Sequence, residues 1–92
     1  MPVWNRPMEL KQQFEEAVVI SKTLPEKPDS ETLLQLYSLY KQSTEGDINS
    51  EPPTNPFDFV AKAKYQAWEA LKGKSSVDAM TEYIALVNKL KS

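Results

Sequence analysis

The stretch SETLLQLYSLYKQSTE, Ser30–Glu45, follows Pro28-Asp29 and precedes Gly46-Asp47. Asp29 is a favoured N-cap residue, and Gly46 suits the left-handed backbone that often ends a helix. On a helical wheel the apolar and aromatic residues of this segment cover roughly 200°, about twice the arc that a one-sided amphipathic helix needs. The pattern predicts a helix that is buried on two sides, or buried on one side and exposed to a ligand on another.

The two sides of this helix differ in chemistry. Tyr40 and Lys41 place a phenol and an ammonium group on an apolar face, which suits a groove better than a dry core. That face comprises Leu33, Leu34, Tyr37, Tyr40, Lys41 and Thr44. The spacing predicts that Leu36 and Leu39 lie on a different side, and that Gln35, Ser38, Gln42 and Glu45 form a narrow polar arc.

Three further segments have helical apolar spacing, roughly Met8–Leu24, Phe57–Lys72 and Ser76–Leu90. Ser75 to Asp78 reads as a capping box at the start of the last segment. No segment alternates with period two, and an irregular loop at 47–55 separates the second and third helices. The chain is predicted to be a single all-α domain, a four-helix bundle. The stripes expected to face its core contain Phe14, Ala17 and Val18; Phe57, Val60, Ala61, Tyr65, Trp68 and Leu71; and Met80, Tyr83, Ile84, Val87 and Leu90.

Composition excludes several classes of function. The 92 residues contain no His and no Cys, which removes the commonest general base, the thiol nucleophile and the usual transition-metal ligands. Two glycines are too few for a glycine-rich phosphate loop, and a net charge of −2 argues against nucleic-acid binding. No apolar run is long enough for a membrane span or a signal peptide. A small binding module is therefore favoured over an enzyme.

Two clusters carry the chemistry of a candidate site. Tyr37, Tyr40 and Lys41 share one helical face, and Lys64 and Trp68 are spaced by four residues in the third helix. If the two helices lie side by side, one lysine from each can hold a single anionic group, while a tyrosine ring offers a surface for a planar base. Each signal alone fits an ordinary solvated lysine or a core aromatic residue. The residues themselves predict a helical bundle with a possible anion-binding, aromatic groove.

The motifs of this chain resemble those of the acyl-CoA-binding protein family. The matching stretches are Leu36–Thr44, Gly46–Asn49, Phe59 through Lys62-Ala63-Lys64, Trp68, Leu71-Lys72-Gly73 and Asp78-Ala79-Met80 followed by Tyr83-Ile84. The resemblance covers about residues 14–90. It implies an up-down-down-up bundle whose long loop joins the second and third helices, and a long-chain fatty acyl-CoA ester as the ligand.

The resemblance also implies residue roles. Tyr37, Lys41 and Lys64 would hold the 3′-phosphate of the CoA ribose. Tyr40 would pack on the CoA head group, and Tyr83 would close on the bound ligand. The remaining positions are Lys22 near the ligand, and Leu33, Leu34 and Val18 along the acyl groove.

The function expected is non-catalytic binding, buffering and transport of medium- to long-chain acyl-CoA, with no cofactor and no metal. The protein is expected to be a cytoplasmic monomer that supplies acyl-CoA-using enzymes, with no nucleic-acid partner and no stable membrane insertion. The alternative is a module whose aromatic groove receives a partner helix. Residues 1–8, with Trp4, are expected to form a flexible extension rather than a cover for the groove. The fourth helix is expected to be short.

Overall fold

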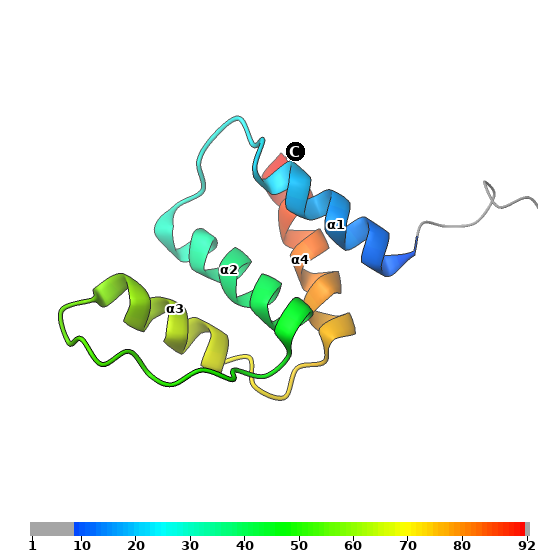
Figure 1. Cartoon of the computed structure of the whole chain (residues 1–92). Coiled ribbons are helices and arrows are strands. Elements are labelled where there is room, and N and C mark those ends of the chain that lie inside the picture. The colour runs from blue at the N-terminus through cyan, green and yellow to red at the C-terminus, as the bar shows by residue number, and fades with distance from the viewer. Residues whose placement is uncertain (1–8, 92) are drawn as a thin grey trace, which may run out of the picture.

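The computed structural model describes residues 9–91, which fold into four helices and no strands. The helices are α1 (Leu10–Ser21), α2 (Ser30–Glu45), α3 (Phe59–Glu69) and α4 (Ser76–Lys91), and Figure 1 shows their arrangement. The expectation for residues 1–8 and Trp4 lies outside the described residues.

Local side-chain caps explain where three of the helices begin. The Asp29 carboxylate accepts a hydrogen bond from the Thr32 amide (2.8 Å), and the Asp58 carboxylate accepts one from the Ala61 amide (3.0 Å). At the start of α4 the Ser75 hydroxyl accepts from the Asp78 amide (3.0 Å), as the capping box predicts. Gly46 ends α2 with a φ of +79°, a backbone conformation that favours glycine.

Helix α2 lies at the centre of the fold. It packs against α4 on one side and α3 on another, while α1 packs against α4. In Figure 1, α2 and α3 run in the same direction, and α1 and α4 run in the opposite one. The connection over residues 46–58 is long because it must return along α2, whose 16 residues span about 24 Å, before α3 can begin. This is the expected up-down-down-up bundle.

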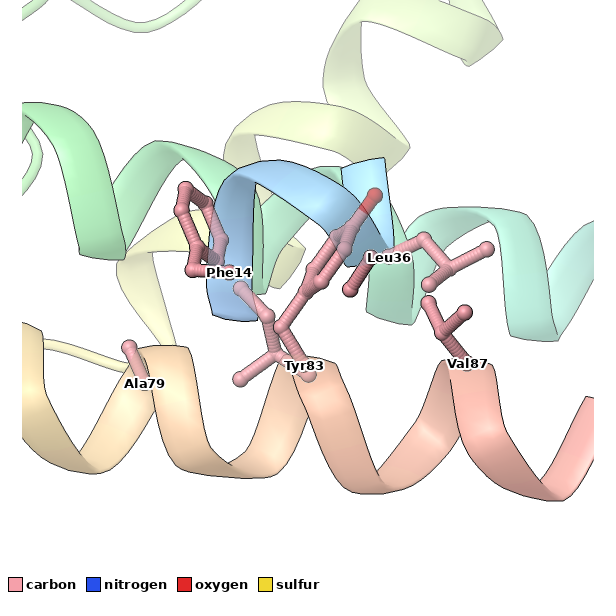
Figure 2. Close-up of a cluster of buried hydrophobic side chains, with 7 residues drawn as sticks. Phe14, Leu36, Ala79, Tyr83 and Val87 are labelled. Carbon is pink, nitrogen blue, oxygen red and sulfur yellow. The ribbon is translucent and has the colours of Figure 1, made fainter. Parts of the chain in front are cut away.

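The core lies between α1, α2 and α4. Tyr83 rises from α4 between Phe14 and Leu36, with its hydroxyl directed away from α4, and Val87 lies on the same helix (Figure 2). The Phe14 ring meets the Tyr83 ring edge-on, with centroids 5.1 Å apart. Leu36 and Leu39 belong to this core, as the helical wheel predicts. The full cluster is Phe14, Ala17, Leu36, Leu39, Ala79, Tyr83 and Val87.

Several sequence expectations about the helices are wrong. Helix α1 is shorter than Met8–Leu24, and α3 is shorter than Phe57–Lys72. Phe57 and Val60 do not face the core and are 80% and 65% exposed, because α3 packs only against α2 and Phe57 lies before α3 begins. The fourth helix is not short, since its 16 residues equal the length of α2.

The predicted polar arc of α2 is also wrong in two places, because Ser38 and Gln42 are buried. The Gln42 amide nitrogen donates to the Asp47 carboxylate (2.9 Å) and to the backbone carbonyl of Lys74 (2.7 Å). The same Asp47 oxygen accepts the Gly73 amide (2.8 Å). These bonds tie the α3–α4 turn to the end of α2, so a residue that reads as solvated is instead a structural connection.

This connection predicts how stability responds to acid. The Gly73 amide, and then the Gln42 side chain, lower the pKa of Asp47 below its ordinary 3.8. A lowered folded-state pKa contributes stability above pH 3.8, and that contribution is lost as the pH falls through the folded value. We expect Asp47→Asn, which keeps an acceptor oxygen, to reduce the loss of stability below about pH 4. Urea midpoints measured from pH 7 to pH 2.5 test this. If the midpoint of Asp47→Asn falls in acid as steeply as that of the wild type, the prediction is contradicted.

Candidate functional site

Two lysines and two aromatic rings face each other across the contact between α2 and α3. The Lys64 ammonium of α3 lies over the Tyr37 ring of α2, 5.2 Å from its centroid. One turn further along, the Lys41 ammonium of α2 lies over the Trp68 ring of α3, 4.9 Å from its centroid. Because the helices are parallel, Tyr37 lies opposite Lys64, and one turn later Lys41 lies opposite Trp68. The two positive charges predicted to cooperate, those of Lys41 and Lys64, therefore lie along the same contact between α2 and α3. We call Tyr37, Lys41, Lys64 and Trp68 the charged seam.

Lys41 has a second partner on its own helix. Its ammonium forms an ion pair with Glu45, and this hydrogen bond raises the pKa of Lys41 and lowers that of Glu45. Lys41 is therefore charged at neutral pH. An incoming anion at the seam must share Lys41 with the Glu45 carboxylate.

An apolar groove adjoins the charged seam. It has a volume of about 340 Å³, and its walls come from the first half of α2 and the first half of α3. Leu33, Leu34, Tyr37 and Lys64 line it, so four predicted site residues meet here. Phe59, Val60 and Ala63 complete its apolar wall, with Ser30 at one edge. The sequence analysis assigned none of these last four to the site.

A second cavity of about 300 Å³ collects six predicted residues, among them Lys22 of the α1–α2 connection. It shares Leu33 and Tyr37 with the apolar groove, so the two adjoin. Its lining is Val18, Ser21, Lys22, Leu33, Leu36, Tyr37, Tyr40 and Tyr83. Of the nine predicted residues, Lys41 alone lines neither space, and its ammonium lies over the Trp68 ring at the seam.

Tyr83 combines a core position with a polar tip. Its side chain is buried, and its hydroxyl donates to the Ser21 hydroxyl at the edge of the second cavity (3.1 Å). Burial raises the pKa of Tyr83, so the phenol stays protonated at neutral pH. The polar partner that a buried tyrosine requires is thus Ser21, and a ligand could contact only the tip of this side chain.

The sequence analysis named only Val18 and Tyr40 as site residues among those that line a third and larger cavity. It measures about 590 Å³ and shares Val18 and Tyr40 with the second cavity. Phe14 forms part of its wall, and the Phe14 ring stacks on Tyr40 with centroids 5.9 Å apart. The helical spacing assigned Phe14 to the core alone. The other lining residues are Lys11, Glu15, Ser43, Thr44 and Met80.

The side chains gathered here suit an amphipathic ligand. Ammonium groups and phenols lie at the seam, and aliphatic side chains lie beside them. Within residues 9–91 no three His, Cys, Asp or Glu side chains are close enough to hold a metal ion. In the same range no helix has the length and apolar character needed to cross a membrane.

Comparison with known protein families shows to which family this chain belongs. The family model described as "Acyl CoA binding protein" matches residues 11–87. This chain belongs to the acyl-CoA-binding protein family. The match spans α1 and α2, α3, and most of α4, so it includes every predicted site residue.

Relatives in the acyl-CoA-binding protein family come from distant organisms. The acyl-CoA-binding protein of Saccharomyces cerevisiae is 51% identical over 79 residues, which cover 86% of this chain and 90% of the yeast protein. That of Dictyostelium discoideum is 49% identical over 77 residues, covering 84% and 90%. The crystal structure of Oryza sativa acyl-CoA-binding protein 2 superposes with a TM-score of 0.83 at 40% identity, covering 89% of this chain and 90% of the rice chain.

Proposed function

We propose that this protein binds fatty acyl-CoA esters and carries them without chemical change. The observation that supports this most directly is the charged α2–α3 seam beside an apolar groove. Acyl-CoA has the same two parts, a phosphorylated nucleotide and a hydrocarbon chain. The names of the relatives, which describe acyl-CoA binding, support the same ligand.

The nucleotide end is assigned to the seam. Lys41 and Lys64 would hold the 3′-phosphate together with the Tyr37 hydroxyl, through charge-assisted hydrogen bonds worth about 1.5–3 kcal/mol each. Tyr40, which is 40% exposed, would offer its ring to the head group. Lys22 and the tip of Tyr83 would contact the ligand from the second cavity.

The acyl chain is assigned to the groove that Leu33 and Leu34 line, with Val18 facing the ligand from α1. Each methylene that leaves water contributes about 0.8 kcal/mol, so affinity should rise with chain length until the groove is full. The nucleotide thus orients the ligand, while the chain supplies length-dependent affinity.

The residue types in the chain support a carrier role. The sequence contains neither His nor Cys, and a thioesterase would need another base and nucleophile. We propose that the protein acts as a cytoplasmic monomer and passes its ligand to enzymes that use acyl-CoA.

Calorimetric titration with palmitoyl-CoA, free CoA and palmitate in parallel tests the proposal. We expect tight one-to-one binding of the ester, weaker binding of CoA and almost none of palmitate. A well-folded sample that does not bind the ester would overturn the proposal and favour a protein partner for the groove.

The ion pair on Lys41 predicts a variant with higher affinity. In Glu45→Gln the competing carboxylate is gone, so Lys41 is free for the ligand phosphate. Exposed ion pairs are weak, so the gain should be modest, and we expect palmitoyl-CoA to bind up to about fivefold more tightly. The matched control is Glu82→Gln, which breaks the Lys74–Glu82 pair away from the site. Equal tightening in both variants would point to net charge rather than to Lys41.

A further inference from the structure

Three large apolar side chains at the start of α3 are left in solvent. Phe57 is 80% exposed, Phe59 is 72% exposed and Val60 is 65% exposed. They are adjacent along the chain, and Asp58 is the one polar residue among them. A contiguous apolar patch on a soluble domain marks an interaction surface more often than scattered apolar residues do. We call Phe57, Phe59 and Val60 the apolar rim.

The apolar rim continues into the acyl groove. Phe59 and Val60 line that groove while remaining largely exposed, and Leu33 of α2 lies in the same wall and is 38% exposed. In Figure 1, α2 and α3 both begin at the same end of the molecule. The rim is therefore the outer edge of the groove, at the end remote from the Lys41–Trp68 pair.

The backbone holds Phe57 outward in a defined turn. The Phe57 amide donates to the Asn55 side-chain oxygen (2.9 Å), and the Asp58 amide donates to the Asn55 carbonyl (3.2 Å). Asp58 in turn caps α3. None of these bonds uses the Phe57 side chain, so its exposure is not needed to form the turn or the helix.

The charges beside the rim fit a phospholipid surface. Lys62 follows Phe59 by three residues, so it lies beside Phe59 about one turn, or roughly 5 Å, further along α3, whereas the Lys64 ammonium lies over the Tyr37 ring of α2. Apolar side chains that enter a bilayer interface go about 5–10 Å into the boundary between head groups and acyl chains, and this would put the Lys62 ammonium near the phosphates. Asp58 within the rim carries the opposite charge to Lys62, so the rim has one charge of each sign beside it, which matches a zwitterionic head group better than a strongly anionic surface.

We propose that the apolar rim docks the protein on a zwitterionic phospholipid membrane and opens the acyl groove toward the lipid hydrocarbon. The inference rests on the proposed function, because it requires an acyl chain in that groove. A chain that passes directly between groove and bilayer avoids the exposure of its methylenes to water, which costs about 0.8 kcal/mol each. The contact is peripheral, in keeping with the absence of a membrane-crossing helix in residues 9–91.

Binding of the ligand-free protein to phosphatidylcholine vesicles tests the surface itself. We expect the wild type to partition onto vesicles and Phe57→Ser to do so about tenfold less, since a buried phenylalanine is lost. Val77→Ser is the matched control, because Val77 is 58% exposed at the start of α4 and lies outside the rim. Failure of the wild type to bind vesicles, or equal binding by Phe57→Ser, would overturn the inference.

Transfer of palmitoyl-CoA from protein to vesicles tests the route. If the ligand passes while the protein touches the vesicle, the transfer rate of the wild type should rise in proportion to vesicle concentration. The transfer rate of Phe57→Ser should depend on vesicle concentration far less. A wild-type rate independent of vesicle concentration would overturn the route.

Calorimetry separates this inference from the proposed function. Phe57 lines neither the groove nor the second cavity, so Phe57→Ser should keep the palmitoyl-CoA affinity of the wild type. Vesicle binding without any palmitoyl-CoA binding would reject the carrier function. It would leave the lipid-docking surface standing.

Discussion

Replacement of both Lys41 and Lys64 by alanine is expected to reduce palmitoyl-CoA affinity by at least about thirtyfold. Each ammonium should contribute about 1–3 kcal/mol through a charge-assisted contact with the ligand phosphate, so the pair should contribute roughly 2–6 kcal/mol. The fold should persist, because alanine is the strongest helix former and neither ammonium group is buried. Calorimetry on the double variant and on each single variant gives the three affinities.

The control for the loss of positive charge is Lys72→Ala, an exposed lysine in the turn after α3. It should bind palmitoyl-CoA as the wild type does. The contact across the seam predicts that both single variants lose affinity for free CoA as well as for the ester, since the phosphate belongs to the nucleotide. If the double variant binds like the wild type, the phosphate site has been assigned to the wrong residues.

Trp68→Ala is expected to lower the free energy of unfolding by about 3–5 kcal/mol, a typical loss for a large aromatic residue removed from a buried position. Trp68 is 3% exposed, and its indole nitrogen donates to the Gly46 carbonyl (2.9 Å), across the contact between α3 and the end of α2. The loss is a large fraction of the stability of so small a domain. Urea denaturation followed by far-UV circular dichroism measures it.

Trp68→Phe separates packing from hydrogen bonding. It keeps a ring beneath Lys41 but removes the indole donor, and we expect a smaller loss of about 1–2 kcal/mol. Should Trp68→Ala cost less than 1 kcal/mol, the α2–α3 contact would not depend on this side chain.

Local chemistry made much of the fold predictable. Asp29 and Ser75 cap helices where their sequence contexts indicate, and Gly46 adopts the positive φ that its place after α2 requires. These signals work because each is satisfied within three or four residues. The shared face of Tyr37, Tyr40 and Lys41 was predictable for the same reason, since helical spacing alone sets it.

The errors fall where burial depends on a distant segment. Phe57 and Val60 continue the apolar spacing of α3, but Phe57 lies before the helix begins and Val60 lines the open groove instead of the core. Gln42 reads as polar surface, yet a carbonyl 32 residues away and the carboxylate of Asp47 accept hydrogen bonds from its amide nitrogen in the interior. Periodicity reports which residues share a face and says nothing of what lies opposite that face.

By itself, the sequence determined the helices, their caps and the chemical types available for binding, because these depend on neighbours along one helix. The tertiary structure decided that α2 and α3 run parallel and in register, so that Lys64 lies over Tyr37 and Lys41 over Trp68. It also decided which apolar residues form the core, which line the groove and which remain at its rim. The physical reason is that burial and charge pairing are properties of two surfaces in contact, and only the packed chain defines the second surface.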